Sequence, residues 1–187
     1  MRRLSVLLML AFTLAACGLL SARDPEPPLA DAGTFAQPDT PEQVIANLQA
    51  AVSELNTLNY RRSLADDLTF APTATALDRE PIWTGWGRTE EEQYFGTLAA
   101  DARQTTGNRL ELNDRTFSIL ADDRYLLDAT YVLTVNHRRT DVPKTVQGRL
   151  QWIITRGGDG LWRLREWTDQ ELGANPSWSD LKAAFLQ

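Results

Sequence analysis

The sequence of 187 residues contains one cysteine, Cys17, and one histidine, His137. A single cysteine excludes an intramolecular disulfide, and a zinc centre usually needs several Cys and His ligands. The sequence also has no serine nucleophile elbow, no phosphate-binding loop and no basic motif interleaved with aromatic residues. A net charge of −6 argues against nucleic acid as a partner. We therefore expect no metal site, no cofactor and no nucleic-acid ligand.

The sequence also lacks an apolar run long enough to cross a bilayer as a helix. The apolar run over 4–14 has about half of the ~20 residues that a spanning helix needs. Arg2 and Arg3 precede this run, and the small residues Ala15 and Ala16 follow it. This order of basic, apolar and small residues is typical of a cleaved secretion signal. Its removal would change the net charge from −6 to about −8.

The segment Leu14-Ala15-Ala16-Cys17 resembles the lipobox of bacterial lipoproteins. In that class the cysteine is acylated and becomes the first residue of the mature protein. The resemblance implies a signal peptide over 1–16 and a membrane partner reached through lipid on Cys17, whose two or three acyl chains would give durable anchoring. In lipoproteins, an Asp directly after the cysteine favours retention in the inner membrane. Here that residue is Gly18, so the resemblance implies the outer membrane, facing the periplasm, in a Gram-negative host. An ordinary cleaved signal with an incidental cysteine is the alternative.

The segment after Cys17 is rich in proline and small or acidic residues and shows no apolar periodicity. We interpret residues 17–39 as the lipidated cysteine and a disordered tether. Residues 40–187, about 150 in number, are enough for one domain with its own hydrophobic core.

The first half of this domain shows helical spacing. Thr40 and Gln43 form a capping box around Pro41 and predict the start of a long helix. Spacing also predicts a short helix over 60–68, an irregular segment over 71–88 and a third helix. The third helix is expected to begin with a capping box at Thr89, with three glutamates in its first turn that favour the helix dipole.

The second half shows the alternation of strands. Four strands are expected, over 110–119, 125–135, 146–154 and 162–167, followed by a helix over 177–185. Because Leu164 and Trp167 are three residues apart, we predict a bulge between them. Helices followed by a run of strands indicate an α+β fold. We expect a curved antiparallel sheet packed on the N-terminal helices, with a short C-terminal helix.

Two segments resemble the nuclear transport factor 2-like, or SnoaL-like, superfamily. The first is Thr40-Pro41-Glu42-Gln43-Val44 at the start of a long helix, and the second is the strand from Gly160 to Asp169. The resemblance covers roughly residues 40–187 and implies a cone in which the sheet curves around helices, with a pocket at its open end. It indicates the fold far better than the function, because members include isomerases, dehydratases, cyclases, binding proteins and dimeric adaptors.

The sequence offers no convincing acid–base set for catalysis. His137 stands at a strand end beside Arg138 and Arg139, and we interpret it as a solvated loop residue. The pairs Asp66-Asp67 and Asp122-Asp123 fit helix ends and turns, and Glu90 to Glu92 fit capping. The candidate residues for a pocket or binding site are Tyr60, Trp83, Trp86, Tyr94, Tyr131, Arg149, Glu166 and Asp169.

Two interpretations of these candidates stay open. An Asp or Glu inside an apolar cone would have a raised pKa and act as a base, whereas the structural interpretation places Glu166 and Asp169 at a rim with arginine partners. Trp83 and Trp86 either seal the cone mouth or form a binding surface. Our leading hypothesis is a lipid-anchored, non-catalytic envelope protein that binds a small apolar ligand or an envelope protein. The alternatives are a small lyase, isomerase or hydrolase, and a homodimer.

Overall fold

The computed structural model describes residues 33–102 and 106–186, all within the unit Ala32–Gln187. The predicted signal peptide, Cys17 and most of the predicted tether lie outside the described residues. Within those residues, no helix is both long and apolar enough to cross a membrane.

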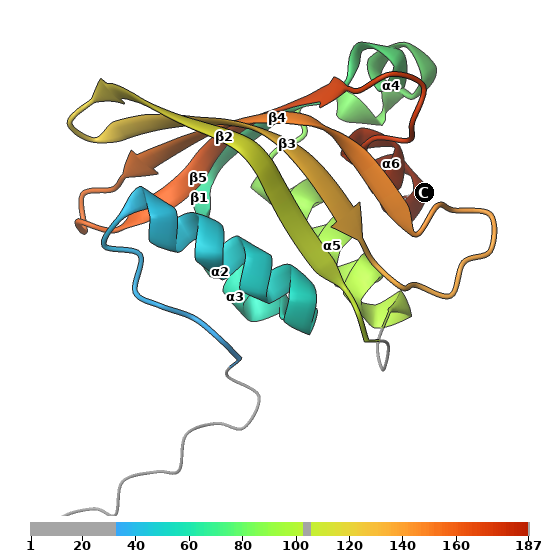
Figure 1. Ribbon diagram of the computed structural model, residues 1–187, viewed down its shortest axis with the longest axis horizontal. Helices are drawn as coiled ribbons and strands as arrows, with labels where there is room; N and C mark the ends of the chain where they lie inside the picture. Colours follow the sequence, from blue (N-terminus) through green and yellow to red (C-terminus); the bar gives the residue numbers. More distant parts are fainter. Residues whose placement is uncertain (1–32, 103–105, 187) are drawn as a thin grey trace, which may run out of the picture. The chain divides into compact units, whose positions relative to one another are not determined.

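The described chain begins with helices and ends with a sheet and one further helix. The elements are α2 (Pro41–Glu54), α3 (Thr57–Arg62), β1 (Leu64–Ala71), α4 (Ala74–Arg79), the short 3-10 helix η2 (Pro81–Trp83), α5 (Arg88–Asp101), β2 (Arg109–Ala121), β3 (Arg124–Thr134), β4 (Thr145–Arg156), β5 (Trp162–Glu171) and α6 (Trp178–Leu186). Figure 1 shows the long strands arching over α2, with α5 beneath them. The predicted α+β fold is confirmed.

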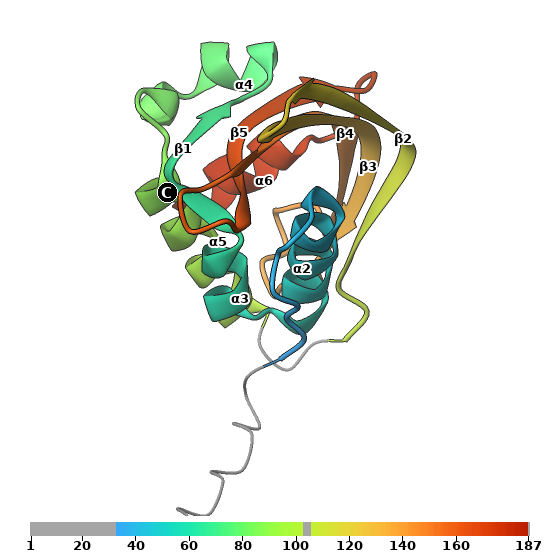
Figure 2. The same ribbon diagram turned by 90° about the vertical axis from the view of Figure 1, so that its left-hand side faces the viewer.

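The sheet has the strand order β1-β5-β4-β3-β2. The strands β2 to β5 form the predicted antiparallel meander, and β1 adds a fifth strand parallel to β5. The sheet curves around α2 and α6, and α5 lies across its open side (Figure 2). Alternate side chains on β3, β4 and β5 point into this space and form the core with α2, α5 and α6.

The predicted bulge on β5 is present. Ile153 pairs with Glu166 while the next residue, Ile154, pairs with Leu164, so that Arg165 is the extra residue on β5. The bulge keeps both Leu164 and Trp167 buried although they are three residues apart. It therefore directs the second half of β5, including Asp169, back into the interior.

Three predictions about local structure are corrected. The helix predicted over 60–68 ends at Arg62, and Leu64 and Leu68 belong to β1. The pairing of β1 with β5 is irregular between Leu64 and Thr69, so the buried residues of this strand imitate helical spacing. Helix α5 begins at Arg88 instead of after a Thr89 cap, because the Glu90 carboxylate accepts the backbone N–H of Gly87 at 2.9 Å.

His137 is the third correction, because it is 1 % exposed and not solvated. Its Nε2 lies 3.2 Å from the carbonyl oxygen of Pro143, and its ring meets the edge of Phe185 with centroids 5.0 Å apart. The loop after β3 therefore folds back over the ring and packs it against α6.

Residues 33–39, which were predicted to belong to the tether, contact the rest of the domain. The side chain of Asn47 on α2 exchanges two hydrogen bonds with the backbone of Ala36, at 2.7 and 2.8 Å. The carbonyl of Pro38 accepts the N–H of Trp162 at 2.8 Å. The ordered part therefore starts before the predicted boundary at residue 40.

Gly148 provides a test of the packing between the sheet and the interior. A Cβ at this position would lie 2.6 Å from the carbonyl oxygen of Gln170 and 2.6 Å from the hydroxyl of Tyr131. We expect Gly148→Ala to lower the free energy of unfolding by about 1–3 kcal/mol, because neither neighbour has room to move. Urea denaturation measures the change. Gly158→Ala, with no atom within 4 Å of the added Cβ, is the control and should change stability by less than about 0.5 kcal/mol.

Candidate functional site

The interior of the sheet contains an ion pair between α5 and α6. Lys182 Nζ lies 2.5 Å from Glu91 Oε2, and both side chains have no exposed surface. On α5, Glu91 lies on the same helical face as Tyr94, Phe95 and Leu98, which are all buried. On α6, Lys182 shares its face with Trp178, Leu181 and Phe185. The two charges are therefore carried inward by the apolar faces of their helices.

Glu91 has two further partners in the interior. Tyr60 donates its hydroxyl to Oε1 at 2.7 Å, and Trp86 donates its indole N–H to Oε2 at 2.9 Å. Burial and the neighbouring Glu91 carboxylate raise the pKa of Tyr60 well above its usual value, so the phenol remains a donor. Every partner of the carboxylate is therefore a donor, which is what a buried anion requires.

Aromatic rings surround the ammonium group of Lys182. Nζ lies 3.5 Å from the ring centroid of Phe70 and 3.5 Å from that of Trp167, and 5.7 Å from the rings of Trp86 and Tyr94. We call these four rings and Glu91 the ammonium cage. Burial lowers the pKa of Lys182 to about 8, against the opposing effect of the Glu91 carboxylate. At neutral pH the ammonium form therefore predominates and forms cation–π contacts with the rings.

A second buried network starts from Asp169 on β5. Its Oδ2 accepts both the backbone N–H of Ser179, at 2.8 Å, and the Ser179 hydroxyl, at 2.7 Å. Its Oδ1 accepts the Tyr131 hydroxyl at 2.8 Å, and that hydroxyl oxygen accepts the N–H of Trp178 at 2.7 Å. Asp169 and Tyr131 therefore satisfy the first N–H groups of α6 and fix where the helix begins.

Burial raises the pKa of Asp169, while hydrogen bonds from Ser179 and Tyr131 and the charge of Lys182 act in the opposite direction. The direction agrees with the rise in pKa expected for a carboxyl inside the cone. Both oxygens of this carboxyl are occupied by Tyr131 and α6, however. A general base needs a position beside its substrate. The arrangement fits a helix-anchoring role better than catalysis.

Helix α6 packs into the space enclosed by the sheet, where the family resemblance implied a pocket. The edge of the Trp178 ring meets the face of Trp167 with centroids 4.5 Å apart, and Trp178 Nε1 donates to the Tyr94 hydroxyl at 3.0 Å. Tyr60, which donates to Glu91, stacks on Phe95 with centroids 3.8 Å apart. The cone interior is therefore packed with the protein's own side chains.

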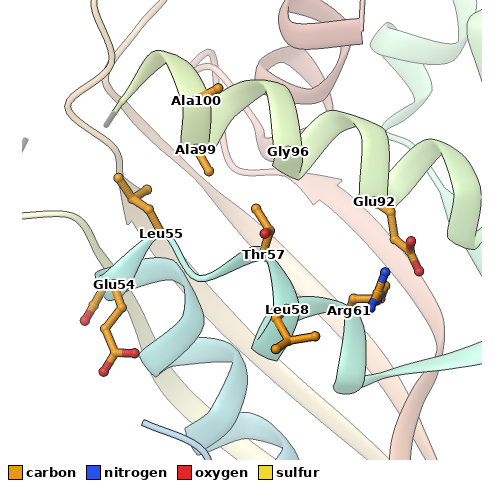
Figure 3. A pocket seen from close by; sticks show the side chains of 10 residues that line it. Glu54, Leu55, Thr57, Leu58, Arg61, Glu92, Gly96, Ala99 and Ala100 are labelled. Atoms are coloured by element: carbon orange, nitrogen blue, oxygen red, sulfur yellow. The ribbon is translucent and has the colours of Figure 1, made fainter. Parts of the chain in front are cut away.

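A groove of about 700 Å³ lies at the surface, outside this packed interior. Figure 3 shows Leu55, Thr57 and Leu58 on one wall and Gly96, Ala99 and Ala100 of α5 on the other. Glu92 at one end forms an ion pair with Arg88 at 2.6 Å. The polar side chains that line the groove are partly or fully exposed, so they offer little to fix a ligand in one orientation.

The structure brings six of the eight candidate residues together in the interior. Tyr60, Trp83, Trp86, Tyr94, Tyr131 and Asp169 are all buried. Arg149 and Glu166 lie on the other face of the sheet, where Arg149 pairs with Asp128 and Glu166 with Arg124, at 2.6 and 2.7 Å. The arginine partner expected for Glu166 exists, but it comes from β3. Trp83 and Trp86 are packed against Phe70 and offer no open binding surface.

Neither residue of the central ion pair was among the predicted site residues. Glu91 was expected to take part in capping, and no role was predicted for Lys182. Helical spacing contained the signal, because Glu91 precedes Tyr94 and Phe95 by three and four residues, and Lys182 follows Trp178 by four. Within the described residues, no group of three or more His, Cys, Asp or Glu side chains is placed to hold a metal ion.

A double-mutant cycle tests the coupling of Glu91 to Lys182. We expect Glu91→Gln or Lys182→Met alone to cost about 3–5 kcal/mol of unfolding free energy, because each leaves a buried charge unpaired. The double variant should lose at least about 1 kcal/mol less than the sum of the two. Chemical denaturation measures all three. The exposed pair Arg124–Glu166 is the control, with Arg124→Met costing at most about 1 kcal/mol. Additive losses at Glu91 and Lys182 would contradict the coupling.

No protein-family model and no curated protein sequence matches the chain. Solved structures do resemble it. A nuclear transport factor 2-like protein of unknown function in nutrient uptake from Rhodospirillum rubrum has a TM-score of 0.52 and 16% identity, covering 69% of this chain and 95% of that one. A nuclear transport factor 2-like superfamily protein from Salmonella enterica serovar Typhimurium has a TM-score of 0.52 and 12% identity, covering 72% and 87%.

A protein of unknown function from Mycobacterium tuberculosis is similar to the same degree, with a TM-score of 0.53 and 16% identity, covering 78% of this chain and 88% of that one. At such identities the likeness concerns the fold. The shared features are the curved open sheet and the helices that it encloses. The described domain therefore has the nuclear transport factor 2-like fold.

Proposed function

We propose that this protein is a non-catalytic, lipid-anchored interaction domain of the cell envelope that binds a partner protein at its surface. The observation that supports it is the occupied interior: α6 places Trp178 and Lys182 where a ligand of the cone would lie. Both oxygens of the interior carboxylate Asp169 bond to Tyr131 and α6. The sequence left two kinds of ligand open, a small apolar molecule inside the cone and a partner protein. The occupied interior therefore favours the partner protein.

The surface feature that favours a protein partner is the second half of β2. This strand lies at an edge of the sheet, and its residues Thr116–Ala121 are exposed and carry no charged side chain. Phe117, Ile119 and Leu120 are 37%, 70% and 50% exposed, three of the six exposed large apolar side chains in the described chain. Edge strands are normally protected by charge, proline or a cover, since their backbone groups otherwise pair with another chain.

This edge would accept an extended segment of an envelope protein as an added strand. The backbone of β2 would supply the hydrogen bonds, and alternate side chains would supply the apolar contacts. Phe117 and Ile119 pair across the sheet with Leu127 and Tyr125, so they share one face. A matching segment therefore carries apolar residues on the face that it shares with these two side chains.

The strand-edge proposal predicts the effect of Ile119→Lys in cells. A photocrosslinker at Ser118 should capture a partner in the wild-type background, and Ile119→Lys should weaken binding roughly 10- to 100-fold, because burying one such side chain is worth about 1.5–3 kcal/mol. Leu77→Lys is the matched control, since Leu77 is 56% exposed on α4, which follows β1 at the opposite edge of the sheet. Equal loss with both variants would overturn the proposal. So would ultracentrifugation showing a dimer that Ile119→Lys dissociates, because the occupant would then be a second copy.

The anchor is proposed from the lipobox-like segment alone. We expect the wild-type protein to incorporate a clickable palmitate and to sediment with membranes, and Cys17→Ser to lose both properties. Gly18→Asp should keep the label, and in a host with two membranes it should move the protein to the inner membrane. Labelling of Cys17→Ser at the wild-type level would show that the lipid is elsewhere, or that Cys17 is incidental.

A further inference from the structure

The walls of the ammonium cage are built without Lys182. Phe70 comes from β1, Trp167 from β5, and Glu91 and Tyr94 from α5, whereas the ammonium group alone comes from α6. Trp86 comes from the loop before α5, so the cage separates into a host contributed by three elements and this loop, and a guest contributed by α6. If the cage is a binding site, its wall residues should keep their positions when the Lys182 side chain is removed.

Contacts that do not involve Lys182 hold the walls in place. Glu91 is fixed by Tyr60 and Trp86, at 2.7 and 2.9 Å. The N–H of Phe70 donates to the carbonyl of Trp86 at 3.2 Å, and the Phe70 ring meets Trp167 edge to face with centroids 5.4 Å apart. Glu91, Trp86, Phe70 and Trp167 are therefore each oriented by another wall residue or by Tyr60, as a preorganised binding site requires.

The chemistry of the walls is specific for a cation of small size. One carboxylate oxygen of Glu91 accepts an N–H of the ammonium group at 2.5 Å. The ring faces of Phe70 and Trp167, with centroids 3.5 Å from the nitrogen, stabilise the positive charge by cation–π contacts. An anion would meet Glu91 and the ring faces unfavourably, and a neutral alcohol would forgo both the ionic and the cation–π attraction. Primary ammonium groups, on an alkylamine or on a lysine side chain, have the matching charge and donors.

We propose that the cone contains a binding site for a primary alkylammonium group, and that Lys182 occupies this site in cis. An external alkylammonium ligand and the Lys182 side chain are then mutually exclusive occupants. This inference concerns the interior and is independent of the proposed partner surface on β2.

The test is to remove the guest and supply it in solution. Lys182→Ala deletes the side-chain atoms Cγ, Cδ, Cε and Nζ, which together correspond to n-propylammonium. The full-length variant is refolded from urea in the presence of n-propylammonium chloride, since the cage has no exposed surface in the folded protein. We expect saturable binding with a dissociation constant of about 1 mM, measured by tryptophan fluorescence and by a rise in melting temperature. Trp86 and Trp167, in the cage walls, provide the fluorescence signal.

Three matched proteins and one matched compound make the result decisive. The wild type and Lys182→Met, whose sites are filled, should not bind n-propylammonium. Lys182→Ala/Glu91→Gln should bind it at least tenfold more weakly, and n-propanol should bind Lys182→Ala at least tenfold more weakly than the amine does. Sodium chloride at equal ionic strength controls for general salt effects.

Two kinds of result would contradict an alkylammonium site in the cage. If Lys182→Ala folds without binding the amine, or fails to fold even in its presence, the walls are no independent site. Equal binding by the wild type, or by the Glu91→Gln double variant, would place the amine elsewhere on the protein. Each of these results would overturn the proposal, while leaving the partner surface on β2 untouched.

Discussion

The ion pair between Glu91 and Lys182 is the constraint on which the arrangement of the interior depends. Burying both charges without exposed surface lowers the stability of the fold, because each charged group loses its hydration. The protein compensates with donors from Tyr60 and Trp86 on the carboxylate and with the faces of Phe70 and Trp167 on the ammonium. These groups come from separate parts of the chain. The position of each is therefore tied to that of the others, and a small displacement of one would leave a buried charge without its partner.

Helix α6 is held at two points by different means. Its first N–H groups bond to Asp169 and Tyr131, which define where the helix begins, and Lys182 on the following turn defines its rotation about the axis. Apolar contacts alone would hold the helix but would specify its register less strictly. A buried polar group can supply that specificity, as the choice of register in coiled coils shows. In this domain the polar contacts thus determine how the apolar core closes.

The parts of the fold that follow from local periodicity were predictable, and the parts that depend on pairing between distant segments were not. Helix α2 and the strands from β2 to β5 were expected from spacing, as was the bulge before Trp167. Strand β1 was mistaken for helix because an irregular pairing with β5 spaces its buried residues by four. Glu91 and Lys182 lay at buried positions of their helices, but charge suggested exposure, and nothing in sequence joined residues 91 positions apart. His137 was misjudged for the same reason, since only the return of the loop at Pro143 buries it.

The occupied interior also bears on where the proposed partner protein would bind. A fold whose cone is open can recognise a small molecule with inward-facing side chains, whereas here α6 commits those side chains to the protein's own packing. Under the proposed function, recognition of the partner protein uses the outer surface, where exposed large apolar side chains are unevenly distributed. Most long strands of the sheet have neighbours on both sides, while β2 ends the sheet with an uncharged run that includes Phe117 and Ile119. Exposed apolar side chains of this size lower solubility unless something covers them. The helix that fills the interior and the uncovered apolar edge of the sheet therefore both support the proposed partner surface on β2.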